Sequence, residues 1–190
     1  MYRITYLFIL LWALTAFSKP SEKLSLSKEL QAEKLPWFAF DAKDSNGTYE
    51  KTVNRDNLKE LVRQKKYRKV VFVFFATWCI PCREGLKKIS DNSAELKKNG
   101  ILIVLVNVAE RNLENYSRRK IDEWARQNGY FKDEWLLVFD QFSNSLEDFG
   151  LHRNDNAEVP LPRTLILDEN LRPMMLIGKE EDDYVQILWK

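Results

Sequence analysis

Cysteine is scarce in this 190-residue chain, which has only Cys79 and Cys82. A structural disulfide framework would need more thiols, spaced so that the bridges close long loops. A bridge across so short a loop adds little stability through chain entropy. Reactivity therefore explains the Cys79-Ile80-Pro81-Cys82 spacing better than a structural link does.

Histidine is scarcer still, because His152 is the only one. A structural zinc site needs four ligands, so the two thiols and this imidazole would need a second copy of the chain or acidic ligands. His152 also lies in a polar stretch, residues 152–156, that is typical of a loop. We therefore expect no metal site and no cofactor, and zinc binding by the cysteine pair is the alternative.

The chain also lacks a strong excess of either charge. It has 30 Lys and Arg residues against 28 Asp and Glu residues, which gives a net charge of +2. Nucleic-acid-binding proteins cluster basic residues on one face, whereas here both signs are mixed along the sequence. This pattern indicates a solvated surface of mixed sign and no nucleic-acid partner.

The apolar run near the N-terminus is shorter than the roughly 20 residues that a transmembrane helix needs. It extends from Ile4 to Phe17 after Arg3 and is typical of a signal-peptide core. Ala16-Phe17-Ser18 offers small residues at the cleavage positions. We expect residues 1–18 to be a signal peptide that exports the chain to the periplasm or an equivalent space, and an uncleaved anchor is the alternative. No cysteine lies near this segment, which excludes a lipoprotein.

Residues 19–34 are polar, rich in Lys, Ser and Glu, and typical of a linker. The folded domain is expected to span residues 35–190. Two runs of strand-forming residues, 37–40 and 48–53, flank the sequence Asp44-Ser45-Asn46-Gly47. Because Asn-Gly between such runs favours a tight turn, this region predicts a β-hairpin.

Apolar strands then alternate with amphipathic helices. A first short helix should begin with Asp56 or Asn57 as its cap. Continuous apolar runs at 70–75 and 101–106 are typical of strands buried on both faces. Further strands are expected at 136–139, 164–167 and 174–177, and helices at 79–98, 113–128, 145–149 and 180–188. This alternation predicts an α/β fold with a mixed central sheet, whose last two strands are antiparallel.

The cysteine pair lies where a buried strand ends and a helix begins. The free N–H groups and partial positive charge of a helix N-terminus stabilise a thiolate, so Cys79 is the expected nucleophile. Cys82 lies one helical turn further on, and we expect it to be more buried and to resolve the mixed disulfide. Pro81 suits a first helical turn, in which its missing N–H would be unpaired anyway. Trp78 is either a core residue or part of a substrate-facing surface.

The segment Val71 to Arg83, with Ala-Thr-Trp-Cys-Ile-Pro-Cys-Arg at its end, resembles the active-site strand, loop and helix of the thioredoxin superfamily. It is most similar to the exported TlpA/ResA/CcmG-like branch. The resemblance covers residues 35–190 and implies a three-layer α/β/α sandwich with a mixed sheet and an extra N-terminal β-hairpin. It also implies a cis-proline that faces the cysteines, assigned to Pro162 with Pro160 as the fallback. The substrate-binding residues are then expected to be Trp78, Ile80, Pro81, Leu161 and Pro162.

Three positions depart from the family pattern. Gly85 stands where the branch often has an acidic residue, and Glu84 is turned about 100° away around the helix. Val73 stands at the position of thioredoxin's buried Asp, and Lys87 at that of its helix-kinking Pro. Gly85 is the residue at which a bend is expected instead. The sequence therefore offers no obvious buried carboxylate to take the proton of Cys82.

The resemblance implies an extracytoplasmic thiol–disulfide oxidoreductase that reduces disulfides of exported proteins, with apocytochrome c among the candidate substrates. We expect protein thiol and disulfide partners, a membrane electron donor of the DsbD/CcdA type, and a monomer. A copper-binding or metallochaperone module on the same fold is the alternative. A redox-inert interaction domain is a third hypothesis, which the intact cysteine pair disfavours.

Overall fold

The computed structural model describes residues 39–42, 51–108, 110, 118–140, 149, 161–178 and 188. The predicted signal peptide, the linker and the turn at 44–47 lie outside this part of the chain. The same holds for His152, Pro160 and most of the helices predicted at 145–149 and 180–188. Across the described residues, no helix combines the length and hydrophobicity needed to cross a membrane.

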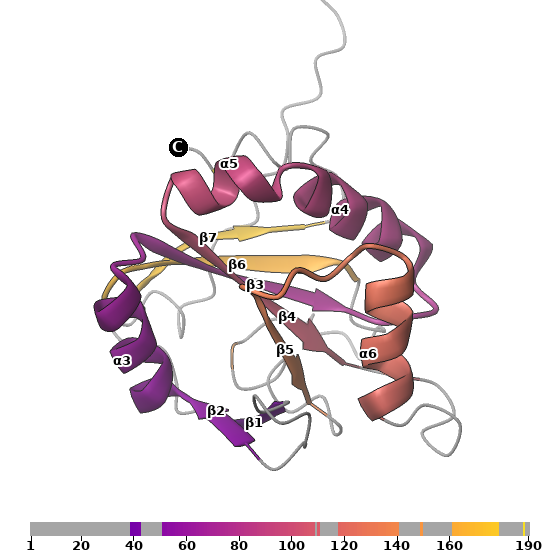
Figure 1. Cartoon of the computed structure of the whole chain (residues 1–190), viewed down its shortest axis with the longest axis horizontal. Helices are drawn as coiled ribbons and strands as arrows, with labels where there is room; N and C mark the ends of the chain where they lie inside the picture. Colours follow the sequence, from indigo (N-terminus) through magenta and orange to yellow (C-terminus); the bar gives the residue numbers. More distant parts are fainter. Residues whose placement is uncertain are drawn as a thin grey trace, which may run out of the picture.

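The described residues form seven strands and four helices. In chain order these are β1 (Ala39–Ala42), β2 (Lys51–Asn54), α3 (Arg55–Lys65), β3 (Lys69–Phe75), α4 (Ile80–Asp91), α5 (Ser93–Lys98), β4 (Ile101–Asn107), α6 (Arg118–Gln127), β5 (Leu136–Phe139), β6 (Arg163–Asp168) and β7 (Pro173–Ile177). Figure 1 shows the strands fanned through the middle of the molecule, with α4 and α5 along the top, α3 at the left and α6 at the right.

All seven strands belong to one mixed sheet, in the order β2-β1-β5-β4-β3-β6-β7. Strand β4 is parallel to both β3 and β5, whereas β6 is antiparallel to β3 and β7 is antiparallel to β6. The mixed sheet and its antiparallel final pair confirm the topology expected from the sequence. Strands β1 and β2 pair antiparallel, and β1 also pairs with β5.

Strands β3 and β4 form the centre of the core. Every residue of β4 is buried, as is every residue of β3 except Lys69. Alternate side chains of β3 point to opposite faces of the sheet. Phe72 stacks on Phe149, whereas Phe75 stacks on Trp124 of α6. Both faces of the central strands are therefore covered, which is why their sequences are continuously apolar.

Helix α3 begins earlier than the sequence predicted. Its cap is Asn54, whose side chain accepts the backbone N–H groups of Asp56 and Asn57 at 3.1 and 2.9 Å. Asn57 in turn accepts the Asn54 N–H at 2.8 Å. The prediction of Asp56 or Asn57 as the cap was wrong because this pair forms a capping box, in which Asn57 is the third helical residue.

The single helix predicted at 79–98 is two helices, α4 and α5, which meet at Asn92. The Asn92 side chain donates to the Lys88 carbonyl at 2.8 Å, and its backbone N–H donates to Ile89. Side-chain bonds of this kind compete with helical ones and end α4 there. Helix α4 passes through Gly85 without a break, so the interruption lies at Asn92 rather than at Gly85.

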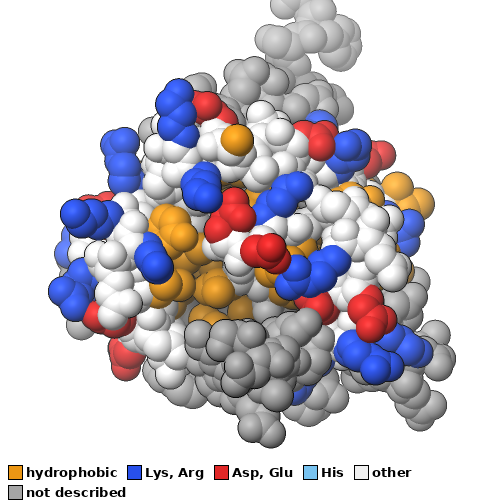
Figure 2. Space-filling view, in the orientation of Figure 1, with side chains coloured by type: hydrophobic (Ala, Val, Ile, Leu, Met, Phe, Trp, Pro, Cys, Tyr) orange, Lys and Arg blue, Asp and Glu red, His pale blue; other side chains and the backbone are white. Residues whose placement is uncertain are grey.

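The described surface carries both charges close together. Figure 2 shows Lys and Arg side chains beside Asp and Glu over one face of the molecule. Several form ion pairs within a helix, such as Arg63 with Glu60 and Lys87 with Asp91. These pairs are exposed, so solvent screens their charges and they add little to the stability of the fold. The described surface therefore exposes charges of both signs to solvent, as the balanced composition indicates.

Candidate functional site: the Cys79–Cys82 disulfide

Cys79 and Cys82 are joined by a disulfide, with sulfurs 2.03 Å apart and Cα atoms 5.2 Å apart. Cys79 is the N-cap of α4, and its Sγ accepts the backbone N–H of Cys82 at 3.2 Å. Pro81 lies in the first turn of the helix, where no intrahelical partner would exist for its N–H. One sulfur therefore lies at the positive end of the helix dipole, as the sequence predicted.

The two cysteines differ little in exposure in this oxidised form. Cys79 is 4% exposed and Cys82 is 1% exposed, so both are buried. Cys82 is the more buried of the two, as expected, but the difference in exposure is small. The difference in role that we expect for them depends on their positions along the helix, since only Cys79 lies at its end.

Two large apolar side chains flank Cys79 in the sequence and reach solvent. Trp78 is 37% exposed and Ile80 is 67% exposed, and they are two of the large hydrophobic residues that are exposed in the described part of the chain. Exposed apolar residues beside a buried disulfide offer a contact surface for a partner. This arrangement favours a surface position for Trp78 over a core position.

The Leu161–Pro162 peptide bond is cis. It immediately precedes β6, whose Arg163 pairs in register with Phe74 of β3. Because β6 is antiparallel to β3, its beginning lies beside the end of β3, where the loop to Cys79 starts. The structure thus places Pro162 at the same edge of the sheet as the disulfide. Leu161, also expected at the site, is buried and belongs to the hydrophobic core.

Glu110 brings a carboxylate to the active-site loop, and the sequence analysis missed it. Its Oε1 accepts the Thr77 backbone N–H at 2.6 Å and its Oε2 accepts the Thr77 hydroxyl at 2.7 Å. Asn107 at the end of β4 also donates to Oε1, at 2.7 Å. Parallel strands end at the same edge of a sheet, so the position of Glu110, three residues after β4, was the available signal.

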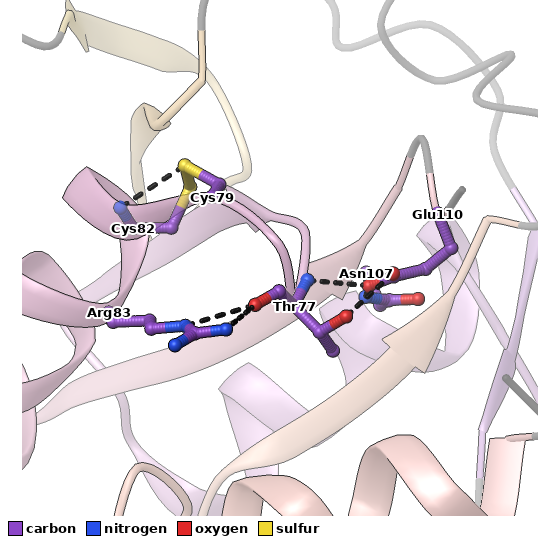
Figure 3. The surroundings of a disulfide bond; sticks show 6 residues. All are labelled: Thr77, Cys79, Cys82, Arg83, Asn107 and Glu110. Atoms are coloured by element: carbon purple, nitrogen blue, oxygen red, sulfur yellow. Dashed lines mark hydrogen bonds between the residues drawn. A yellow bond between two sulfur atoms is a disulfide. The ribbon is translucent and has the colours of Figure 1, made fainter. Parts of the chain in front are cut away.

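Arg83 holds the same loop residue from the other side. Its Nε and Nη2 donate to the Thr77 carbonyl oxygen at 3.0 and 2.7 Å. Its guanidinium also lies over the Trp124 ring, 5.9 Å from the centroid. Figure 3 shows Thr77 between Arg83 and Glu110, with the disulfide above them. All the polar groups of buried Thr77 are therefore bonded to charged side chains.

The positions at which the sequence departs from the family pattern carry no buried carboxylate. Val73 is buried in β3, Glu84 is exposed on α4, and Lys87 pairs with Asp91 at 3.0 Å. Over the residues that the structure describes, no group of three or more His, Cys, Asp and Glu side chains is placed to hold a metal ion.

Known proteins that are similar to this chain include a thiol-disulfide oxidoreductase, which agrees with the presence of a cysteine pair at this site. The chain is similar to the thiol-disulfide oxidoreductase ResA of Geobacillus thermodenitrificans, with 29% identity over 110 residues, 57% of this chain and 54% of that protein. The chain thus spans about half the length of this curated relative.

Solved structures share the fold. A secreted thiol-disulfide isomerase from Corynebacterium glutamicum matches with a TM-score of 0.59 and 18% identity, covering 90% of this chain and 92% of that one. StoA from Bacillus subtilis matches with a TM-score of 0.53 and 15% identity, covering 80% and 97%. The fold is therefore the thioredoxin-like α/β fold that the sequence implied. The model of the AhpC/TSA family matches residues 34–172, and the chain belongs to that family.

Proposed function

We propose that this chain is an extracytoplasmic thiol–disulfide oxidoreductase that reduces disulfides of exported proteins. The observation that carries the proposal is the Cys79–Cys82 disulfide, with Cys79 Sγ at the N-cap of α4. A thiol at a helix N-terminus has its pKa lowered from about 8.5 into the range of roughly 3.5–7.5, which makes it a thiolate near neutral pH. The similarity to ResA supports the same activity.

The reaction starts from the reduced pair. The Cys79 thiolate attacks a sulfur of the substrate disulfide, forms a mixed disulfide and releases one substrate thiolate. The Cys82 thiol loses its proton and attacks Cys79 Sγ, which releases the second substrate thiolate. The substrate gains two electrons, and the chain is left with the Cys79–Cys82 disulfide. A dithiol donor then restores the reduced pair by the same exchange in the opposite direction.

The substrate is expected to lie over the exposed residues beside Cys79. Trp78 and Ile80 supply apolar contact area, and Pro81 lies between Ile80 and Cys82. Pro162 and Leu161 border the same edge of the sheet, where backbone groups can hydrogen-bond an extended substrate segment. We assign these residues to substrate binding, with Cys79 as nucleophile and Cys82 as resolving cysteine.

The proposed compartment rests on the N-terminal sequence, and the proposed electron donor rests on the resemblance to the TlpA/ResA/CcmG-like branch. A signal peptide at residues 1–18 places the domain outside the cytoplasm, where a membrane protein of the DsbD/CcdA type is the donor class suited to keeping the pair reduced. Apocytochrome c and other exported thiol proteins are the proposed substrates, and the chain is proposed to act as a monomer.

The test is a reduction assay with purified protein. We expect dithiothreitol to open the Cys79–Cys82 disulfide reversibly, with a mass change of two hydrogens, and the reduced protein to reduce insulin. Cys79→Ser should abolish turnover, and Cys82→Ser should accumulate the mixed disulfide. A pair that does not cycle, or equal turnover by Cys79→Ser, would contradict the proposal. A glutathione equilibrium that strongly favours the dithiol would instead assign the chain to oxidation or isomerisation.

A further inference from the structure

Thr77 lies two residues before Cys79 and is held between two opposite charges. Its N–H and hydroxyl donate to Glu110, and its carbonyl accepts two hydrogen bonds from Arg83. We propose that Glu110 and Arg83 are positioning residues that fix the loop before Cys79 and set, with opposite sign, how readily Cys79 ionises. This inference rests on the proposed exchange at Cys79.

The positioning part follows from how completely Thr77 is bonded. The residue is 2% exposed, and each of its hydrogen-bonding groups has a partner at 3.0 Å or less. Glu110 is itself held by Asn107 at the end of β4, and Arg83 belongs to α4. The loop is thereby attached to the central sheet on one side and to the active-site helix on the other. Small displacements of Cys79 relative to α4 are restricted as a result.

The electrostatic part follows from the charge that reduction creates. Adding two electrons and two protons to the disulfide gives two thiols, and Cys79 then loses a proton to become the attacking thiolate. A nearby carboxylate disfavours that negative charge, whereas a nearby guanidinium favours it. Glu110 is partly buried and Arg83 is exposed, so solvent screens the arginine more strongly.

Other charged groups lie on the elements around the loop. They are Glu84 on α4, Asp140 after β5 and Arg163 at the start of β6. The charges of these three residues are the same in the wild type and in every variant of Glu110 and Arg83, so they do not affect the comparison. The two side chains that bond Thr77 are therefore the ones to vary.

Glu110→Gln separates charge from position. The amide oxygen can replace Oε1 and keep accepting from the Thr77 N–H and from Asn107. The amide nitrogen replaces Oε2 and can donate to the Thr77 hydroxyl, because a hydroxyl both donates and accepts. The substitution thus retains the three hydrogen bonds while it removes the negative charge.

The experiment measures the pKa of the Cys79 thiol from the pH dependence of its alkylation by iodoacetamide. It also measures the equilibrium in which two glutathiones reduce the protein disulfide and yield glutathione disulfide. We expect Glu110→Gln to lower the Cys79 pKa by about half a unit or more, which is about a threefold gain in thiolate at pH values below the pKa. The glutathione equilibrium should move toward the dithiol by a similar factor. Arg83→Gln should shift both readouts in the opposite direction.

The matched control is Glu123→Gln, which makes the same charge change on the exposed side of α6 and should leave both readouts unchanged. Unchanged values in folded Glu110→Gln, or shifts of the same sign in Glu110→Gln and Arg83→Gln, would overturn the proposal. Should Glu110→Gln fail to fold, an unchanged or lowered pKa in Arg83→Gln would overturn it equally. Alkylation needs no protein substrate, so failure of the insulin assay in the wild type is distinguished from failure of this inference.

Discussion

Arg83 lies over the indole ring of Trp124, with its Cζ 5.9 Å from the ring centroid, and the same ring stacks on Phe75 at 6.0 Å. Phe75 is the last residue of β3, and Arg83 follows Cys82 directly. One partly buried side chain of α6 therefore contacts the residues before and after the active-site loop. Helix α6 thus packs against both elements that flank the disulfide, β3 and α4.

Replacing Trp124 by Leu should destabilise the fold by about 2–4 kcal/mol, because the stacked contacts are lost and a cavity remains. Urea unfolding of the oxidised protein, followed by circular dichroism, gives the free energy. Trp78→Leu is the matched control, since Trp78 is exposed whereas Trp124 packs against the core, and we expect it to cost less than about 1 kcal/mol. A similar loss of unfolding free energy in the two variants would contradict the idea that the contacts of Trp124 with Phe75 and Arg83 stabilise the fold.

Trp78 and Ile80 should matter to protein substrates more than to small disulfides. Trp78→Ala combined with Ile80→Ser removes the apolar surface beside Cys79, so the KM for insulin reduction should rise severalfold. The rate with a small aromatic disulfide should change less than about twofold, because such a reagent needs little contact area. Equal losses with both reagents would instead indicate that the double variant has disturbed Cys79 itself.

Asn54→Ala should lower the free energy of unfolding by about 0.5–2 kcal/mol, since the cap of α3 is lost. Asn54→Ser keeps a side-chain oxygen at the cap and should recover most of the loss. Asn57 completes the capping box, so the effects of Asn54→Ala and Asn57→Ala should not add. Additive effects measured by urea unfolding would mean that the two side chains act independently.

Burial lowers the pKa of Lys69 below its ordinary value of 10.5, and nearby Arg68 lowers it further. The unfolded chain therefore binds more protons than the folded chain between the lowered pKa and 10.5, and stability should rise with pH across that window. Lys69→Gln should remove this rise. Unfolding curves of oxidised wild-type and variant protein, compared at increasing pH up to about 10, provide the test. Parallel pH profiles would contradict the prediction.

The sequence predicted the central strands and the cysteine pair well because their signals are local. Continuous apolar runs set β3 and β4 to within one residue, and a helix start at the cysteines was evident from Pro81 and the amphipathic pattern after it. The resemblance to a known family supplied Pro162, whose cis bond the structure confirms. No local pattern of residues would have distinguished it from Pro160.

The contacts of Glu110 and Arg83 were not predicted because they depend on tertiary structure. Glu110 is 33 residues from Thr77 in the sequence, and only the parallel pairing of β3 with β4 brings them together. Arg83 is exposed on α4, as a charged residue of an amphipathic helix is expected to be, and nothing in that pattern indicates its bonds to Thr77. The periodicity of a sequence does not show which groups a charged side chain at the end of a strand will bond, because its partners come from other elements.

The bonding of Thr77 also determines which part of the site can adapt to partners of different shape. A backbone whose N–H and C=O are both held by side chains from the sheet edge and the helix is a fixed frame, and it will resist remodelling when a partner docks. Adaptation must then come from rotamer changes of exposed side chains, chiefly Trp78 and Ile80, or from the partner itself. For the proposed exchange reaction, a fixed frame of this kind would favour substrates that present a disulfide in an extended, accessible segment over compact proteins whose disulfides are packed.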